Sequence, residues 1–106
     1  MIEKKLKSIN PKNNVIIRSW DIPSLSDVDS IISKTAQAQK TWSEVDLSSK
    51  LNFLKNLAHI LDEKSNEMSL LMADEIGKPI KQGIGEIHKC VWLCDYYLKY
   101  AEQFLK

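Results

Sequence analysis

Apolar residues recur at the spacing of an α-helix along most of the chain, from residue 24 to its C-terminal end. Four stretches show this period, and each predicts one amphipathic helix. The first extends from about Ser26 to Trp42 and opens with Ser26-Asp27-Val28-Asp29, the order of a capping box. Its apolar face predicts packing against a hydrophobic core. That face carries Val28, Ile31, Ile32, Thr35, Ala38, Gln39 and Trp42.

The second and third stretches lie between Asp46 and Ile76. Asp46 is a start signal for the second helix, because an aspartate side chain accepts hydrogen bonds from the first turn. The third helix is predicted from about Ser65 to Ile76, and its methionines indicate adaptable packing. The apolar stripe of the second helix comprises Leu47, Leu51, Leu54, Leu57, Ala58 and Leu61.

Gly77-Lys78-Pro79 marks the clearest boundary in the chain. Glycine accepts the left-handed conformation after a helix, and proline needs no donor at a first helical position. A fourth helix follows, and its two adjacent apolar rows predict contact with more than one neighbour. Gly83 and Gly85 weaken its first turns and would permit a close backbone approach. The first row is Ile80, Ile84, Ile87, Val91, Cys94, Leu98, Ala101 and Leu105, and the second is Leu93, Tyr97, Tyr100 and Phe104.

Residues 1–23 differ from the rest of the chain and predict an N-terminal arm with a β-hairpin. Asn10-Pro11 starts a turn and Asn13-Asn14 closes it, because asparagine tolerates positive φ. Val15–Trp20 is β-branched and aromatic, which favours a strand. A two-stranded hairpin is marginal in water, so these strands need another surface. Four lysines, Lys4, Lys5, Lys7 and Lys12, make this arm basic.

The composition predicts one small globular unit over residues 1–106, with four amphipathic helices over 24–106. The chain has 106 residues and a formal net charge of +1, which argues against a dedicated nucleic-acid binder. No apolar stretch approaches the roughly 20 residues that span a bilayer, and the N-terminus shows no signal core. Cys90 and Cys94 are expected to be reduced, buried thiols, and the chain is expected to be cytoplasmic.

The chain carries no complete catalytic, phosphate-binding or metal-binding motif. Gly77-Lys78 lacks the earlier glycine and the following Ser or Thr of a phosphate loop. Gly83-Ile84-Gly85 lacks the third glycine of a dinucleotide fingerprint, because His88 occupies that position. Cys90 and Cys94 form an i, i+4 thiol pair, and His88, two residues before Cys90, points in a different direction around the helix, so no metal is expected.

The order of several short motifs resembles the beginning of an NAD(P)-dependent aldehyde dehydrogenase, over about residues 8 to 106. Asn14 departs from the family, which usually has Gly there, and Asn tolerates the same turn. Within the family, Gly77–Ile80, Lys89-Cys90 and Leu93–Tyr97 are most similar to the succinate-semialdehyde dehydrogenase branch. The motifs are Ser8–Pro11, Asp27–Asp29 with Trp42, Glu75–Pro79, Gly85–Ile87 and Asp95–Tyr97.

This resemblance implies that the chain is the N-terminal helical part of the α/β aldehyde dehydrogenase fold, a portion of the cofactor-binding domain. Members of the family are several times longer, and the remaining stretch holds their cofactor site, nucleophilic cysteine, glutamate base and oxyanion-binding asparagine. Neither Cys90 nor Cys94 matches the nucleophile position. We therefore expect no catalytic or cofactor-binding residue among these 106 residues, and no activity from this chain alone.

The same resemblance places Lys89 and Trp92 near the substrate tunnel of the intact enzyme. There a lysine would attract the carboxylate of a semialdehyde, and an indole would form a wall. The implied cofactor is NAD or NADP, and the implied partners are a small aldehyde and the remainder of the fold or a second copy. Neither a nucleic acid nor a membrane is expected as a partner. The alternative is a free-standing helical module from a truncated gene, which would bury Leu93, Tyr97, Tyr100 and Phe104 by association.

Overall fold

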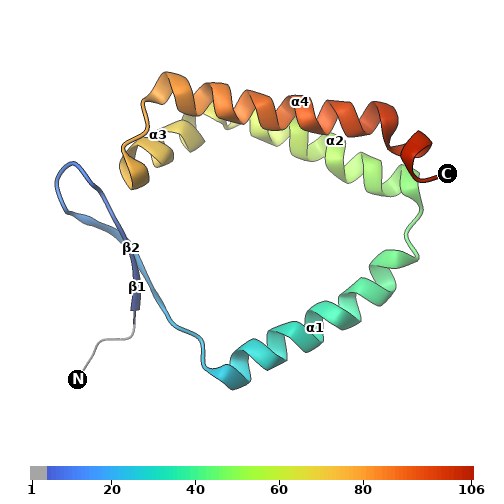
Figure 1. Cartoon of the computed structure of the whole chain (residues 1–106), viewed down its shortest axis with the longest axis horizontal. Helices are drawn as coiled ribbons and strands as arrows, with labels where there is room; N and C mark the ends of the chain where they lie inside the picture. The colour runs from blue at the N-terminus through green and yellow to red at the C-terminus, as the bar shows by residue number, and fades with distance from the viewer. Residues whose placement is uncertain (1–4) are drawn as a thin grey trace.

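The computed structural model describes residues 5–106, so residues 1–4 of the predicted basic arm lie outside the described residues. An N-terminal hairpin precedes four helices, which confirms the predicted mainly α architecture (Figure 1). No helix of residues 5–106 is long and apolar enough to cross a membrane. The elements are β1 (Lys5–Ile9), β2 (Ile16–Asp21), α1 (Leu25–Ser43), α2 (Leu47–Glu63), α3 (Ser65–Ile76) and α4 (Ile80–Phe104).

The hairpin turns where the asparagines predict it. Strands β1 and β2 pair antiparallel, with Leu6 opposite Trp20. Asn14 has a φ of 60°, and the Asn10 N–H donates to the Val15 carbonyl at 2.9 Å. Asn13 stabilises the same turn, because its side-chain oxygen accepts from the Val15 N–H at 3.0 Å.

The hairpin touches the rest of the molecule at the end of α3. The Ser8 hydroxyl donates to Glu75 Oε1 at 3.1 Å. Pro11 also reaches Gly77, where an added Cβ would lie 3.5 Å from Pro11 Cγ. The apolar side chains of the strands remain uncovered, since Leu6 is 59% and Trp20 42% exposed. The surface that the strands were predicted to need is therefore only partly supplied by α3.

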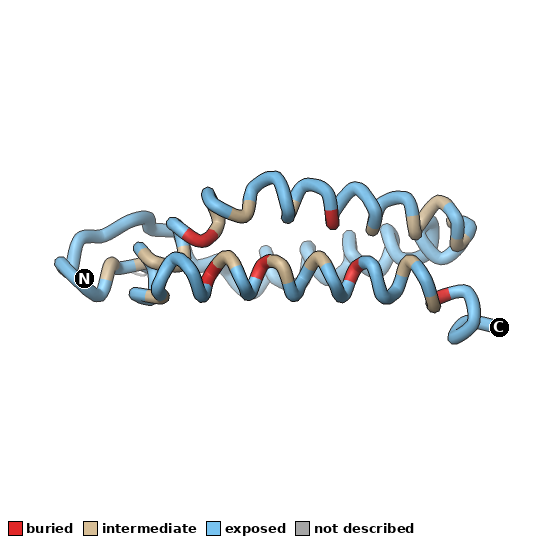
Figure 2. The backbone as a smooth tube through the Cα atoms, turned by 90° about the horizontal axis from the view of Figure 1, so that it is seen from above, coloured by how far each residue is buried: buried red, intermediate tan, exposed pale blue. Residues whose placement is uncertain are grey.

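Helix α4 is the centre of the packed part of the molecule. It packs against both α2 and α3, which confirms the prediction of more than one neighbour. Ile87, Cys94 and Ala101 of its first apolar row are buried, as is Ala58 on α2. Figure 2 shows how few positions along the backbone are buried. The second row is largely exposed, so helix packing inside the chain accounts for one row only.

Gly83 permits the close approach of α4 to α3. Ser69 of α3 is completely buried, and a Cβ added at Gly83 would lie 2.9 Å from the Ser69 Cβ. Real Cβ atoms do not come this close, so only glycine fits at this crossing. Gly85 has nothing within 4 Å of its added Cβ, and its predicted role in close packing is wrong.

The boundary between α3 and α4 follows the predicted chemistry with one shift. Gly77 adopts the left-handed conformation, with φ 70° and ψ 21°, and its N–H donates to the Ala73 carbonyl. Pro79 is the N-cap of α4 and has a ψ of 134°, so the first helical residue is Ile80. The glycine ends one helix and the proline turns the chain into the next.

The predicted capping box of the first helix is wrong by two residues. The N-cap is Ser24, whose hydroxyl accepts from the Asp27 N–H at 3.1 Å, and Asp27 accepts from the Ser24 N–H at 2.9 Å. The sequence contains two overlapping Ser-Xaa-Xaa-Asp frames, and the earlier one forms directly after Pro23. The helix therefore begins at Leu25.

The prediction that α1 packs its apolar face into a core is also wrong. No residue of α1 is buried, and Ile31 and Ile32 are 57% and 61% exposed. Figure 1 shows α1 standing apart from the layer formed by α2, α3 and α4. The face is amphipathic as predicted, but most of it is exposed, and its described contact with α2 is at Trp42, whose ring lies 5.6 Å from that of Phe53.

Candidate functional site

The start of α4 forms one wall of a polar hollow of about 480 Å³. Its lining side chains come from the turn before α4 and from one face of the first turns of the helix. Gln82, Glu86 and Lys89 share that face because they are four and three residues apart. Gly85 leaves its floor open, since nothing lies within 4 Å of its added Cβ. The lining residues are Lys78, Gln82, Gly85, Glu86 and Lys89.

An ion pair fixes one side of this hollow. The Lys78 ammonium pairs with Glu86 Oε2, and the Lys78 side chain is 27% exposed. The pair ties the turn after Gly77 to the second turn of α4. Sequence reasoning missed this contact, because Lys78 was considered only in a helix boundary, a rejected phosphate-loop motif and the family motifs. The contact could have been expected from the sequence, because a lysine just before a helix can reach a glutamate on the second turn of that helix.

The structure brings Lys89 into the hollow but not Trp92. Lys89 lies one turn beyond Glu86, is exposed, and has no ion-pair or hydrogen-bond partner within residues 5–106. Trp92 does not line the hollow and is 67% exposed on α4. The two predicted residues therefore offer a free ammonium and an uncovered indole on neighbouring parts of one helix.

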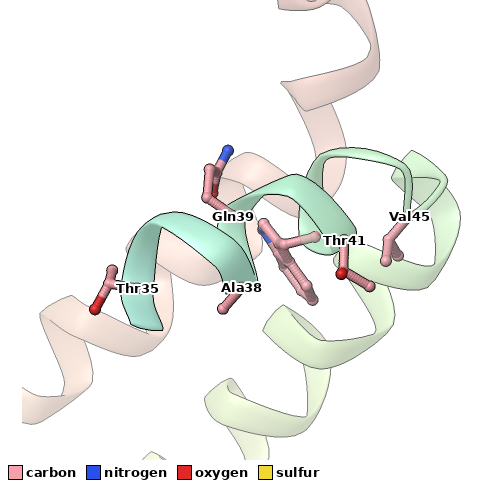
Figure 3. Close-up of a pocket in the computed structure, with 6 residues that line it drawn as sticks. Thr35, Ala38, Gln39, Thr41 and Val45 are labelled. Atoms are coloured by element: carbon pink, nitrogen blue, oxygen red, sulfur yellow. The ribbon is translucent and has the colours of Figure 1, made fainter. Parts of the chain in front are cut away.

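A second hollow, of about 500 Å³, lies at the C-terminal end of α1, where sequence reasoning expected core packing. Figure 3 shows Thr35, Ala38, Gln39, Thr41 and Val45 around it, from α1 and the turn after it. The sixth lining residue is Trp42, whose ring lies 5.6 Å from that of Phe53 on α2.

Lys50 of α2 makes a cation–π contact at the same junction, with its Nζ 5.4 Å from the centroid of the Trp42 ring. These two ring contacts join α1 to α2, and the residues that line the hollow present mostly apolar surface. The second hollow is therefore an apolar recess at a helix junction.

The two cysteines differ in their surroundings. Cys94 is buried as predicted, whereas Cys90 is exposed, so the prediction that both thiols are buried is wrong for Cys90. Burial raises the pKa of the Cys94 thiol, and the nearby Asp95 and Cys90 raise it further. Cys94 is thus held as a thiol at neutral pH, which opposes a role as an attacking thiolate.

The glycines of α4 do not form a dinucleotide cradle. A cradle needs free backbone N–H groups at a turn between a strand and a helix. Gly83 instead lies inside α4, packs on Ser69, and donates its N–H to the Pro79 carbonyl at 3.0 Å. These residues therefore do not fit NAD or NADP. Nor do three His, Cys, Asp or Glu side chains group as metal ligands anywhere in residues 5–106.

Comparison with known proteins places the chain in one class of enzyme. The model of the aldehyde dehydrogenase family matches residues 2–106, which is nearly the whole chain. The chain belongs to the aldehyde dehydrogenase family. The resemblance seen in the order of its motifs is confirmed.

Three relatives illustrate where in the family the similarity falls. Aldehyde dehydrogenase family 7 member A1 of Pisum sativum is 29% identical over 91% of this chain and 19% of its own length. A probable succinate-semialdehyde dehydrogenase [NADP(+)] of Synechocystis is 26% identical over 94% of this chain and 22% of its own length. The succinate semialdehyde dehydrogenase [NAD(P)+] Sad of Escherichia coli is 27% identical over 93% of this chain and 21% of its own length. The chain thus spans about a fifth of the length of the curated relatives it matches.

Proposed function

We propose that this chain is the N-terminal helical portion of an aldehyde dehydrogenase of the succinate-semialdehyde type. In intact form that enzyme would oxidise an aldehyde to a carboxylic acid with NAD(P). The observation that supports this best is the family match over residues 2–106, which covers the hairpin and all four helices in order. Relatives named as succinate-semialdehyde dehydrogenases support the branch. The compartment we propose is the cytoplasm.

In this proposal the cofactor and the reacting thiol belong to other parts of the fold. NAD(P) would accept the hydride, and no residue described here is assigned to hold it. The role of this chain is to build one side of the substrate path and to cover the cofactor domain with its helices. The uncovered apolar face of α1 supports the covering role, because such faces are normally buried.

Lys89 is our candidate for recognising the substrate carboxylate. Its ammonium is exposed beside the polar hollow and has no partner within the described residues, whereas Lys78 is already neutralised by Glu86. A free ammonium can form a charge-assisted hydrogen bond with the far carboxylate of a semialdehyde. Trp92 would line the path with an apolar surface that contacts the carbon chain of the substrate.

A chimera tests this proposal. This chain would replace the matching segment of the E. coli succinate semialdehyde dehydrogenase, and aldehyde-dependent formation of NAD(P)H would be measured. We expect activity from the chimera and none from the 106-residue chain alone. The proposal would be contradicted by a chimera that is folded and has the oligomeric state of the parent enzyme but is inactive. Turnover by the isolated chain would also contradict it.

The role of Lys89 is tested in the same chimera with two substrates. Lys89→Ala should raise KM for succinate semialdehyde about tenfold or more, the loss typical of a charge-assisted hydrogen bond, and leave KM for butanal nearly unchanged. Lys81→Ala on the same helix is the matched control, because Lys81 does not line the hollow. Equal effects on the charged and the uncharged aldehyde would exclude a carboxylate-binding role.

The alternative function is a free-standing helical module that binds protein. The exposed second row of α4 supports it, because Leu93 and Phe104 are more than half exposed. Reading the source gene past the codon for Lys106 separates the two proposals. An open frame that leads to a nucleophilic cysteine and a glycine-rich cofactor loop supports the enzyme, and a stop codon supports the module.

A further inference from the structure

A third hollow, of about 410 Å³, lies between α2, α3 and α4 and contains every cysteine of the chain. Its walls are almost entirely hydrocarbon, with leucines of α2 on one side and α4 on the other. The thioether side chain of one methionine on α3 also lines the hollow. Six of the residues that line it are Leu54, Leu57, Leu61, Met68, Cys90 and Cys94.

The two thiols lie on the same face of α4. Cys90 and Cys94 are one helical turn apart, which places their directions about 40° from each other around the helix axis. Cys90 is exposed and Cys94 is buried, so the pair leads from solvent into the hollow. Met68 lies against the same space from the neighbouring helix. Three sulfur side chains from two helices therefore border one apolar volume.

Helix geometry decides what the pair of thiols can do. Side chains four residues apart have Cβ atoms about 5–6 Å from each other. A disulfide needs about 3.5–4.5 Å between Cβ atoms, so Cys90 and Cys94 are too far apart for one without distortion of the helix. A bridging ion with metal–sulfur bonds of about 2.3 Å spans a sulfur–sulfur separation of up to roughly 4.6 Å, which suits this spacing.

The surroundings select a soft ion. Zinc requires four ligands, and residues 5–106 contain no group of three His, Cys, Asp or Glu side chains. His88, the nearest imidazole in sequence, faces Asp62 instead, with its Nε2 3.7 Å from Asp62 Oδ1. Thiolate and thioether ligands favour Cu(I), which accepts two or three ligands and an apolar environment.

We propose that Cys90 and Cys94, with Met68 as a third ligand, form a binding site for a soft monovalent cation of the Cu(I) type. Each thiol that binds gives up its proton to solvent, and the oxidation state of the ion does not change. This site is independent of the proposed aldehyde oxidation, because none of its three ligands is assigned to the substrate path.

Competition for Cu(I) under anaerobic conditions tests the site in the 106-residue chain. The chain would be titrated against a chromogenic Cu(I) chelator, and the thiolate-to-metal absorption band would be recorded. We expect one Cu(I) per chain. Cys90→Ser should lower the affinity at least about tenfold, because the ion loses one of its two thiolates. Met68→Leu should lower it by a smaller factor while keeping the apolar packing.

A relocated thiol provides the matched control. The double variant C94A/D95C keeps two thiols but turns the second about 140° from Cys90 around the helix axis. We expect it to bind as weakly as Cys90→Ser. Binding by this variant equal to that of the parent chain, or two ions bound per chain at separate thiols, would overturn the proposal. Circular dichroism checks that each variant is folded. If substitution of the buried Cys94 unfolds the chain, Cys90→Ser still tests the site, because Cys90 is exposed.

Discussion

At the scale of single residues, the contact between Gly83 and Ser69 fixes how closely α3 and α4 pack. The nearest atoms to an added Cβ at Gly83 are the Cβ and Cα of Ser69, at 2.9 and 3.2 Å. Neither atom belongs to a flexible side-chain end, so the clash can be relieved only by moving a helix. The sequence places Gly83 within an apolar helix, but it does not reveal which residue lies opposite.

Gly83→Ala should therefore destabilise the chain although alanine is the better helix former. Overpacking a close crossing costs about 1–3 kcal/mol, and the gain in helix propensity returns up to about 1 kcal/mol. We expect a net loss of about 1–2 kcal/mol in the free energy of unfolding, measured by urea denaturation followed by circular dichroism.

Gly85→Ala is the matched control for that prediction. It makes the same change two residues away on the same helix, at a position with nothing within 4 Å of the added Cβ. We expect it to stabilise the chain by up to about 1 kcal/mol. If both variants changed stability in the same direction, the close contact between α3 and α4 would be refuted.

Asp46 gives a residue-scale prediction for the effect of pH. The hydroxyls of Ser48 and Ser49 donate to its carboxylate at 2.7 Å, and the Ser49 N–H donates at 2.9 Å. These bonds hold the pKa of Asp46 well below its ordinary value of 3.8. The charged cap therefore contributes stability at neutral pH that is lost progressively as the pH falls below about 4.

Asp46→Asn removes this titration and keeps an N-cap acceptor, since asparagine is an equally good N-cap residue. We expect the parent chain to have the higher Tm at about pH 6 and the difference to shrink or disappear near pH 2. Thermal melts at a series of pH values measure it. Asp29→Asn is the control, because Asp29 takes no part in the N-cap of α1 or α2. A Tm difference for Asp46→Asn that stays constant at every pH would contradict the lowered pKa of Asp46.

At the scale of elements, the hydrophobic period predicts which face of a helix is apolar but not whether anything covers it. The rows of α1 and α4 look alike in the sequence, yet Ile87 and Cys94 are buried while Ile31 and Ile32 are exposed. The difference depends on α2 and α3, which fold back on α4 and leave α1 apart. The four helices and the hairpin were therefore predictable, and the covering of α1 was not.

The candidate site was predictable to a similar extent. Lys89 and Trp92 were singled out by the family resemblance, and both are exposed on α4. The pairing of Lys78 with Glu86 depends on how the turn after Gly77 directs the chain, which sequence spacing does not specify. The overlapping Ser-Xaa-Xaa-Asp frames show the same limit, because both satisfy the local chemistry and only the path of the chain after Pro23 selects Ser24.

The contrast between α1 and α4 predicts unequal local stability. Helix α1 has no buried residue and is joined to α2 through Trp42 and Phe53, whereas α4 packs against two helices. Hydrogen exchange followed by mass spectrometry should show α1 amides exchanging at least about tenfold faster than the central amides of α4. Equal protection of both helices in dilute solution would show that the face of α1 is covered.

At the scale of the whole molecule, the chain has far more surface than a compact protein of its mass. Its accessible surface is 8919 Å², whereas a compact protein of this mass exposes about 6,100 Å². Its radius of gyration is 18.5 Å, against about 13 Å for a compact chain of this length. The excess of about 2,800 Å² lies in the range buried at obligate interfaces. The chain is thus shaped to pack against another body.

Self-association of the isolated chain follows from this excess surface. We expect its sedimentation coefficient to rise with concentration, because a second copy can cover the apolar face of α1. The double variant I31E/I32E should shift the chain toward monomer, since both side chains are more than half exposed on that face. S30E/S33E adds the same charge to the opposite face of α1 and should associate like the parent chain. A monomer at every concentration, with the hydrodynamic radius of a compact protein, would show instead that α1 folds back on α2 and α4. Equal effects of I31E/I32E and S30E/S33E would show that net charge alone governs association.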